Sequence, residues 1–373
     1  MSKPRLLYLV TEDWFFCSHF ISRAKAAKEA GYDIFVAARE GRHGDEIKRA
    51  GFEFLPVNFQ RSEVNPIAIF KEVLAVINIY RKVRPDLVHH VALRPIIVGG
   101  VSAKICRLKG VVNAPVGMGY VFTSMSPKAK LLKPVVTSLL RLLLKGRDCI
   151  LENNDDLSEL IKRGLLHPHN AILIEGAGVS LSEYGFHLRE NMRPKVMLAA
   201  RMLKEKGIQE FIEAAEIINR KGRGCDFLLV GGCDAGNPGS IPQETIKEWC
   251  KKSGVKWVGH SEEMQKTILE ADIFCLPSYR EGLPKSLLEA GASGCSIITT
   301  DVPGCRQIIK NMRTGLVVPP RDSLALANAI ETLLETPALR ASLAAAMRIE
   351  IEEKYSEEII NRSTLVVYER LLS

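Results

Sequence analysis

The chain has 373 residues, which suits two domains of about 150 to 200 residues better than one. Hydrophobic residues make up 46% of it, enough for a sizeable core, so a disordered chain is excluded. Its nine cysteines are an odd number and lack C-x-x-C spacing, which excludes a disulfide framework or a zinc site and favours reduced thiols in the cytosol. Neither an export signal nor a transmembrane segment is expected.

The positive charge of the chain is concentrated in one stretch. The net charge is +8, and residues 101–150 hold nine lysines and arginines but only one acid, Asp148. The rest of the chain is therefore close to neutral. A local excess of this kind predicts an anionic partner, such as a membrane, a nucleic acid or a phosphate-bearing substrate.

Strands and helices are expected to alternate along the first half of the chain. Buried strands are predicted at residues 5–10, 33–38, 87–91, 111–114, 149–151 and 171–174, and helices at residues 24–30 and 67–84. This alternation is typical of a parallel sheet with helices on both faces.

The turn-rich residues 181–195 are interpreted as a linker, after which the alternation restarts. The second set comprises strands at 196–200, 227–231, 255–258, 273–276 and 296–299, with helices at 207–221, 242–253, 262–270, 284–292 and 342–373. The predicted fold is α/β, with two Rossmann-like domains facing across a cleft. The expected domains are residues 1–185 and residues 186–355, and residues 356–373 form a helix packing back on the first domain. Strand ends facing the cleft would bind the ligand.

The first candidate site lies between a predicted strand and a helix, where the sequence reads RMLKEKG over residues 201–207. A diphosphate needs cations and free backbone N–H groups at the carboxyl end of a strand. Arg201 can hold two oxygens with its planar guanidinium, and Lys206 adds a mobile charge. The alternative is a solvated basic turn.

The second candidate site reads EGLPKSLLE over residues 281–289 and follows another predicted strand. Pro284 suits the first position of a helix. Glu281 would then lie in the loop at the mouth of that helix, and Glu289 on the helix behind it. One carboxylate can meet sugar hydroxyls while the other reaches a ribose diol. Two unrelated surface glutamates are the alternative for this spacing alone.

Together these motifs resemble the retaining glycosyltransferases of family 4, which have the GT-B fold. Further segments agree with the resemblance, namely residues 86–90, 176–180, 258–260, 271–278 and 315–320. It spans nearly the whole chain and is strongest between residues 195 and 320. It implies that residues 1–185 form the domain on the acceptor and membrane side and residues 186–355 the nucleotide-sugar domain.

The resemblance implies a role for each matching residue. Arg201 and Lys206 would neutralise the donor diphosphate, Glu281 would contact the transferred sugar, and Glu289 would bind the ribose. Backbone groups near Gly259 would approach the base. Donor binding would also involve the helix mouth, which is formed by Gly282, Leu283, Pro284 and Lys285. No metal and no cofactor is expected, because the chain has no D-x-D spacing.

Some positions depart from the family pattern. Many members have a histidine in the loop that here spans residues 113–119, and many have glutamate where Gln307 stands. The acceptor side is therefore open, and His19, His89 and His90 are candidates for a polar role in the cleft, with Gly117 as a further cleft candidate. For each histidine, a structural role at the end of a strand or helix is the alternative.

Residues 126–147 form a basic amphipathic stretch, with a kink expected at Pro134. Such a helix can lie in the headgroup layer of an anionic membrane, although a core helix with a solvated basic stripe fits the pattern equally well. The charge favours the membrane, and the resemblance is greatest to transferases acting on polyprenyl-diphosphate-linked sugars. It implies UDP-GalNAc or UDP-Gal as donor, a lipid-linked saccharide as acceptor, and a peripheral place on the cytoplasmic face of the cell membrane, in O-antigen, lipopolysaccharide or glycoprotein-glycan assembly.

Two other classes of protein remain open. One is a nucleotide-sugar epimerase of the same fold. The other is a non-enzymatic nucleic-acid-binding protein, which the charge permits but which would need exposed aromatic residues among the basic ones. No nucleic-acid partner is therefore expected.

Overall fold

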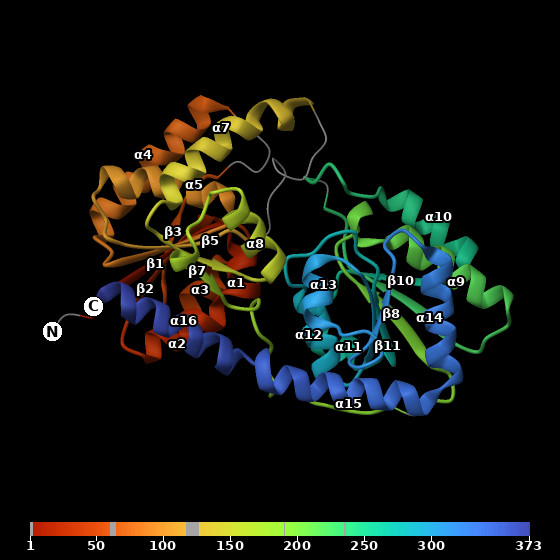
Figure 1. Cartoon of the computed structure of the whole chain (residues 1–373). Helices are drawn as coiled ribbons and strands as arrows, with labels where there is room; N and C mark the ends of the chain where they lie inside the picture. The colour runs from red at the N-terminus through yellow and green to blue at the C-terminus, as the bar shows by residue number, and fades with distance from the viewer. Residues whose placement is uncertain (1–2, 60–64, 117–126, 190, 235) are drawn as a thin grey trace. The chain divides into compact units, whose positions relative to one another are not determined.

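The computed structural model describes residues 3–59, 65–116, 127–189, 191–234 and 236–373 (Figure 1). The chain forms two compact α/β units, the first of Met1–Ala177 with Glu357–Ser373 and the second of Gly178–Ser356. The first boundary lies ahead of the expected 185/186 because Val179 already belongs to the second unit, where its backbone N–H donates to the carbonyl of Tyr355 (3.0 Å).

The described residues of the first unit form a seven-stranded parallel sheet in the order β3-β2-β1-β4-β5-β6-β7. Its strands are β1 (Arg5–Glu12), β2 (Asp33–Arg39), β3 (Glu53–Pro56), β4 (Leu87–Val91), β5 (Gly110–Ala114), β6 (Asp148–Leu151) and β7 (Ala171–Leu173). Its helices are α1 (Asp13–His19), α2 (Ile21–Glu29), α3 (Gly44–Arg49), α4 (Pro66–Val83), α5 (Leu93–Ile105), α7 (Pro127–Leu144), α8 (Asn154–Lys162), the 3-10 turn η1 (Pro168–Asn170) and α16 (Glu357–Leu372). Of these elements, β3, α1, α3, α5 and α8 were not predicted from the sequence.

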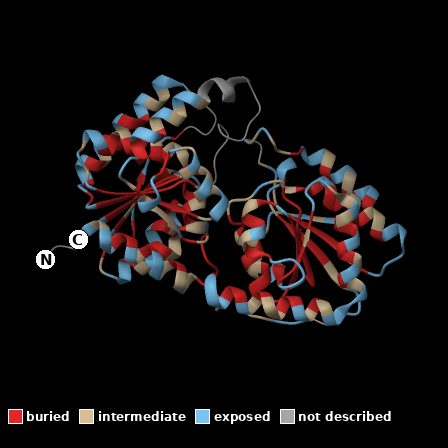
Figure 2. Ribbon diagram, in the orientation of Figure 1, coloured by how far each residue is buried: buried red, intermediate tan, exposed pale blue. Residues whose placement is uncertain are grey.

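Helices cover both faces of this sheet, because successive side chains of β1 point to opposite sides. Leu7 and Leu9 pack in the cluster that includes residues of α4 and α5, and Leu6 and Tyr8 pack in the one that includes α1, α2 and α16. Both layers of the core are drawn as buried in Figure 2. The Tyr8 and Tyr368 hydroxyls lie 2.9 Å apart, which ties α16 to β1.

The second unit contains a six-stranded parallel sheet in the order β10-β9-β8-β11-β12-β13. Its strands are β8 (Lys195–Ala199), β9 (Asp226–Val230), β10 (Lys256–Gly259), β11 (Ile273–Leu276), β12 (Ser296–Thr300) and β13 (Leu316–Val318). Its helices are the 3-10 turn η2 (Lys204–Lys206), α9 (Ile208–Arg220), α10 (Gln243–Ser253), α11 (Met264–Ile268), α12 (Lys285–Ala292), α13 (Pro303–Ile308), α14 (Ser323–Glu335) and α15 (Pro337–Lys354). The sequence analysis missed β13, α13 and α14.

The stretch expected to be a free linker, residues 181–195, is instead attached to the second unit. The Arg189 guanidinium donates hydrogen bonds to the carbonyls of Leu269 (2.7 Å), Ala271 (2.8 Å) and Ser293 (2.9 Å). These three hydrogen bonds from one side chain hold the described part of residues 181–195 against the second unit, ahead of strand β8.

The basic amphipathic stretch forms α7, with Pro134 inside the helix. Of its described leucines, Leu140, Leu143 and Leu144 are buried in the core, whereas Leu142 is 56% exposed. Much of the described aliphatic face of α7 therefore packs in the protein core, as in the alternative interpretation of residues 126–147 as a core helix with a solvated basic stripe. Residue 126 lies outside the described residues. Within the described part of the chain, none of the helices combines the length and apolarity that crossing a bilayer requires.

Candidate active site

The candidate residues of the second unit meet at the carboxyl ends of β8 and β11. These two strands are neighbours in the middle of the sheet, although β9 follows β8 on one side and β12 follows β11 on the other. The chain therefore leaves these two neighbouring strands towards opposite sides of the sheet, and this is the position at which open parallel sheets usually bind a ligand. Arg201 and Lys206 follow β8, and Glu281 follows β11.

An ion pair joins the two loops across this point. The Lys206 ammonium lies 2.5 Å from Oε1 of Glu281, and the Ser278 hydroxyl donates to the same oxygen at 2.6 Å. The side chains of Lys206 and Glu281 are only 17% and 9% exposed. Partial burial strengthens the pair and fixes both charged groups at the strand ends.

Glycine is required at the position after Lys206. Gly207 has a φ of +69°, and a Cβ there would lie 2.1 Å from the carbonyl oxygen of Pro277. The same two loops are joined by a hydrogen bond from the backbone N–H of Tyr279 to the carbonyl of Glu205 (2.8 Å). Close backbone contact of this kind brings Lys206 and Glu281 together.

Arg201 is held by a carboxylate that the sequence analysis missed. Its guanidinium donates to Oδ2 of Asp234 at 2.8 Å, and the Arg201 side chain remains 46% exposed. The loop after β9 runs beside residues 201–206, since Met202 N–H donates to the carbonyl of Gly232 (3.0 Å) and Lys204 N–H to that of Gly239 (2.9 Å). A carboxylate shortly after the predicted strand 227–231 was the available signal for Asp234.

Helix α12 places the second glutamate of the motif. It begins at Lys285, directly after Pro284, and Leu283 before it is buried. The Glu289 carboxylate lies 3.6 Å from the Lys285 ammonium. Burial raises the pKa of Glu289, while Lys285 and a hydrogen bond from Tyr184 oppose that rise.

Two glycines, Gly231 and Gly259, bring two backbone segments close together beside the loop that carries Arg201. Gly231 N–H donates to the carbonyl of Gly259 at 2.7 Å, and a Cβ on Gly231 would lie 1.8 Å from the carbonyl oxygen of Ala200. Gly259 has a φ of +75° with no other atom within 4 Å of its Cβ position. A flat ligand can approach backbone here without meeting side chains. At the other end of the site, a Cβ on Gly304 would lie 2.1 Å from the carbonyl oxygen of Gly282.

The described candidates in the first unit, His19, His89 and His90, do not form a comparable site. His90 is fully buried in β4, with its ring nitrogens 2.8 Å from the Tyr80 hydroxyl and 3.0 Å from Oδ1 of Asn113. Burial lowers the pKa of His90 to about 4, so the ring is neutral and structural. The prediction of a polar role for His90 at the surface of a cleft is therefore wrong.

The other candidates of that unit have mixed outcomes. His89 is also fully buried and lies 2.7 Å from the Tyr368 hydroxyl, so it too is structural. His19 is half-buried at the end of α1 and stacks on the ring of Phe15 at 4.2 Å. Gly117 lies outside the described residues.

Comparison with known proteins agrees with this geometry in both units. The family model for glycosyl transferase 4-like proteins matches residues 5–154, and the one for glycosyl transferases group 1 matches residues 193–336. Two parallel-sheet α/β units, matched in turn by two glycosyltransferase family models, are the architecture of a GT-B glycosyltransferase. The chain therefore belongs to the group 1 and family 4-like glycosyltransferases, and it is an enzyme of that class.

Similar proteins span nearly the whole chain. An N,N'-diacetylbacillosaminyl-diphospho-undecaprenol alpha-1,3-N-acetylgalactosaminyltransferase of Campylobacter jejuni is 26% identical over 93% of this chain and 94% of its own length. The capsular polysaccharide biosynthesis glycosyltransferase CapM of Staphylococcus aureus is 24% identical over 89% and 88%. A glycosyltransferase structure from Rickettsia africae superimposes with a TM-score of 0.82 at 19% identity, covering 100% of both chains.

A further solved structure holds a nucleotide. Anabaena HepE in complex with UDP has a TM-score of 0.77 to this chain at 16% identity, covering 98% of this chain and 100% of its own. At this identity the likeness concerns the fold.

Proposed function

We propose that this enzyme is a retaining glycosyltransferase that moves a hexose or N-acetylhexosamine from a nucleotide-sugar, UDP-GalNAc or UDP-Gal, to a lipid-linked saccharide. The observation that carries the proposal is the contact between Lys206 and Glu281 at the carboxyl ends of β8 and β11, with Arg201 in the same loop as Lys206. Cations and a carboxylate held together suit a donor that carries a diphosphate at one end and sugar hydroxyls at the other.

Each residue takes one part of the transfer. Arg201 and Lys206 neutralise the diphosphate as the bond between it and the sugar C1 breaks, and Glu281 accepts hydrogen bonds from sugar hydroxyls. The acceptor hydroxyl forms the new bond to C1 on the face that the diphosphate leaves, and its proton passes to the departing phosphate oxygen. Glu289 binds the ribose diol, and the backbone at Gly259 receives the base. Stabilising the departing charge in the transition state then supplies most of the rate.

The transfer is proposed to need no metal. Among the described residues, no three His, Cys, Asp or Glu side chains stand close enough to hold an ion. In place of a metal ion, the side chains of Arg201 and Lys206 and the N–H groups at the start of α12 would compensate the negative charge of the donor diphosphate. Activity should be unchanged in EDTA; loss of activity that Mn²⁺ or Mg²⁺ restores would refute this.

The acceptor is proposed to be a saccharide on a polyprenyl diphosphate at the cytoplasmic face of the cell membrane, with residues 126–147 contacting the anionic lipid surface. The named substrate of the Campylobacter relative and the capsular role of the Staphylococcus relative support an acceptor in surface-glycan, O-antigen or glycoprotein-glycan assembly. The exposed cations Arg141 and Lys145 support the lipid contact.

The proposal is tested with radiolabelled UDP-GalNAc and UDP-Gal and a lipid extract that contains polyprenyl-linked saccharides. Label should enter the organic phase with one donor, and digestion of that product with an α-specific glycosidase should release it. Release by a β-specific enzyme alone would refute retention. Free sugar interconversion would indicate the epimerase, and a shift of nucleic acid in a gel without transfer would indicate the binding protein.

A further inference from the structure

Helix α4 carries a row of large apolar side chains on its exposed side. Ile67, Phe70 and Leu74 are 67%, 62% and 45% exposed. The spacing of three and four residues places them on one face over two turns. The exposed and buried sides of the helices in this unit can be followed in Figure 2.

This row is not needed for the core of the unit. The other side of α4 supplies the core, where Val73, Val76, Ile77 and Tyr80 are buried against β1, β2 and β4. The helix therefore has two apolar faces, one satisfied by the sheet and one open. Three large apolar side chains exposed together on one face of a helix are typical of an interaction surface.

The exposed side of α4 is also free of negative charge. The only acid in the helix is Glu72, which is 4% exposed and accepts two hydrogen bonds from Arg94 at 2.9 and 2.7 Å. Lys71, Arg81 and Lys82 are exposed. An apolar row with cations beside it is the pattern of a helix that lies in the headgroup layer of an anionic bilayer.

The neighbouring helices also expose apolar and cationic side chains. α5 packs between α4 and α7 on one face of the sheet (Figure 1). Ile105 at the end of α5 and Leu142 of α7 are 54% and 56% exposed. The sequence has no Asp or Glu between residues 87 and 147, and the exposed cations among the described side chains of α5, α7 and the turns after them are Lys104, Arg107, Lys109, Arg141 and Lys145.

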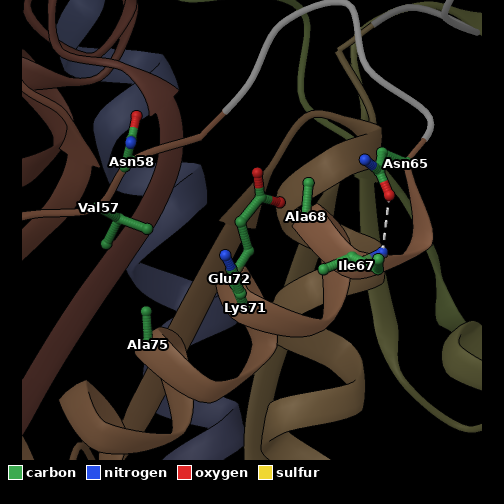
Figure 3. A pocket seen from close by; sticks show the side chains of 8 residues that line it. All are labelled: Val57, Asn58, Asn65, Ile67, Ala68, Lys71, Glu72 and Ala75. Atoms are coloured by element: carbon green, nitrogen blue, oxygen red, sulfur yellow. Dashed lines mark hydrogen bonds between the residues drawn. The ribbon is translucent and has the colours of Figure 1, made fainter.

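A pocket lies beside the apolar row. It has a volume of about 270 Å³ and is lined from one side by Val57 and Asn58, after β3, and from the other by the first turns of α4 (Figure 3). Ile67 and Lys71 line the pocket. The charge of Glu72 at its wall is balanced by Arg94, so an anionic headgroup meets Lys71 without an uncompensated carboxylate.

We propose that the outer surface of α4, α5 and α7 is the docking surface for an anionic lipid bilayer, and that Ile67, Phe70 and Leu74 of α4 supply its apolar contact. In α7, Leu140, Leu143 and Leu144 are buried, whereas Val135 and Leu142 are 65% and 56% exposed and add to this contact. A second copy of the chain would bring cations against cations, and a nucleic acid would leave the apolar row exposed. The inference rests on the proposed lipid-linked acceptor, and it identifies α4 as the helix whose side chains enter the headgroup layer of the bilayer.

Flotation with vesicles tests the surface. The wild type, Ile67→Ser/Phe70→Ser/Leu74→Ser, and a matched control, Met312→Ser/Leu324→Ser/Ile349→Ser, are mixed with vesicles of phosphatidylglycerol and phosphatidylcholine in equal parts. The control residues lie in the second unit and are 60%, 58% and 55% exposed. The α4 variant should bind at least about 100-fold more weakly, given the free energy of burying three large apolar side chains by half or more. The control should bind like the wild type.

Salt separates the apolar from the cationic contribution. Charge attraction is screened at high salt and apolar burial is not, so the wild type should retain part of its binding at high salt and the α4 variant none. All three proteins should transfer sugar equally to a short water-soluble acceptor.

The outcomes distinguish this inference from the proposed function. Equal vesicle binding by the α4 variant and the wild type would overturn the role of α4 while leaving the lipid-linked acceptor in place. No binding by the wild type, with intact transfer to the soluble acceptor, would overturn both the docking surface and the membrane part of the proposed function. A wild-type dimer that the α4 variant converts to monomer in size-exclusion chromatography would assign the row to a second copy and overturn the inference.

Discussion

Replacing Glu281 with glutamine should separate its catalytic role from its structural one. The carboxylate accepts hydrogen bonds from Lys206 (2.5 Å) and Ser278 (2.6 Å) and is 9% exposed. Glutamine keeps the shape and one acceptor oxygen but loses the charge. A hydrogen bond to a charged group contributes about 1.5 to 3 kcal/mol and a neutral one about 1 kcal/mol, so the free energy of unfolding should fall by about 0.5 to 2 kcal/mol. The corresponding drop in Tm is about 1 to 8 °C for a domain of this size.

The effect on turnover should be much larger than the effect on stability. A charged contact made to the reacting sugar in the transition state is worth about 100- to 1,000-fold in kcat. The assay is transfer of labelled sugar at saturating donor, with thermal melting of the same samples. Glu270→Gln is the control, because Glu270 also pairs with a lysine, Lys195 at 2.9 Å, but is 55% exposed and remote from β11's carboxyl end. Glu270→Gln should leave kcat unchanged and keep the free energy of unfolding within about 0.5 kcal/mol of the wild-type value.

A double-mutant cycle extends the test to Lys206. If Lys206 and Glu281 act as one unit, Lys206→Met combined with Glu281→Gln should lower kcat no further than the worse single variant. Turnover of Glu281→Gln within about threefold of the wild type, or full additivity in the cycle, would refute the site.

Three further predictions follow from single residues. Gly207→Ala should destabilise the second unit by several times the effect of Gly222→Ala in urea melts. Both glycines have a φ of +69°, but only a Cβ at Gly207 would lie 2.1 Å from the carbonyl oxygen of Pro277. Gly222→Ala should lower the free energy of unfolding by about 1 kcal/mol, and equal effects of the two changes would contradict the role of crowding at Gly207. Arg201→Ala should weaken UDP binding at least about 10-fold in calorimetric titration and lower turnover by orders of magnitude. Its Tm should stay close to that of the wild type, because the Arg201 side chain is 46% exposed. Unchanged UDP affinity would show that Arg201 does not belong to the donor site. Burial lowers the pKa of His90 from 6.5 to about 4, so below pH 6.5 the unfolded chain takes up a proton that the folded chain does not, and stability should fall as the pH drops towards 4. His90→Gln should remove about 3 kcal/mol of that dependence in a pH series of urea melts, and an unaltered slope would show that His90 is not its source.

Local patterns in the sequence determined most of the secondary structure. Strand β11 was predicted at the residues where it is found, and β4 likewise, because uninterrupted apolar runs bounded by turns are read from neighbouring residues. Helix α5 was missed because its run of apolar residues and two adjacent glycines has no amphipathic period, which reflects burial of Ile96, Gly99 and Gly100.

The site residues of the second unit were also named from sequence, because motifs in RMLKEKG and EGLPKSLLE combine charge with a strand before and a helix after. The motifs could not show how those residues pair. Lys206 and Glu281 are 75 residues apart, and they meet only because β8 lies beside β11 in the sheet. Asp234 was missed for the same reason, since its contact with Arg201 depends on β9 lying on the other side of β8.

Tertiary packing alone decided which side of an amphipathic helix faces water. The periodicity of residues 126–147 shows that one side is aliphatic, but whether that side meets a bilayer or a protein core depends on what stands opposite. Packing placed Leu140, Leu143 and Leu144 of α7 in the core and left Phe70 of α4 in solvent. The same holds for His90, whose neighbours in a strand pattern do not reveal that Tyr80 and Asn113 surround its ring. Sequence period specifies a face, and only the fold specifies the partner of that face.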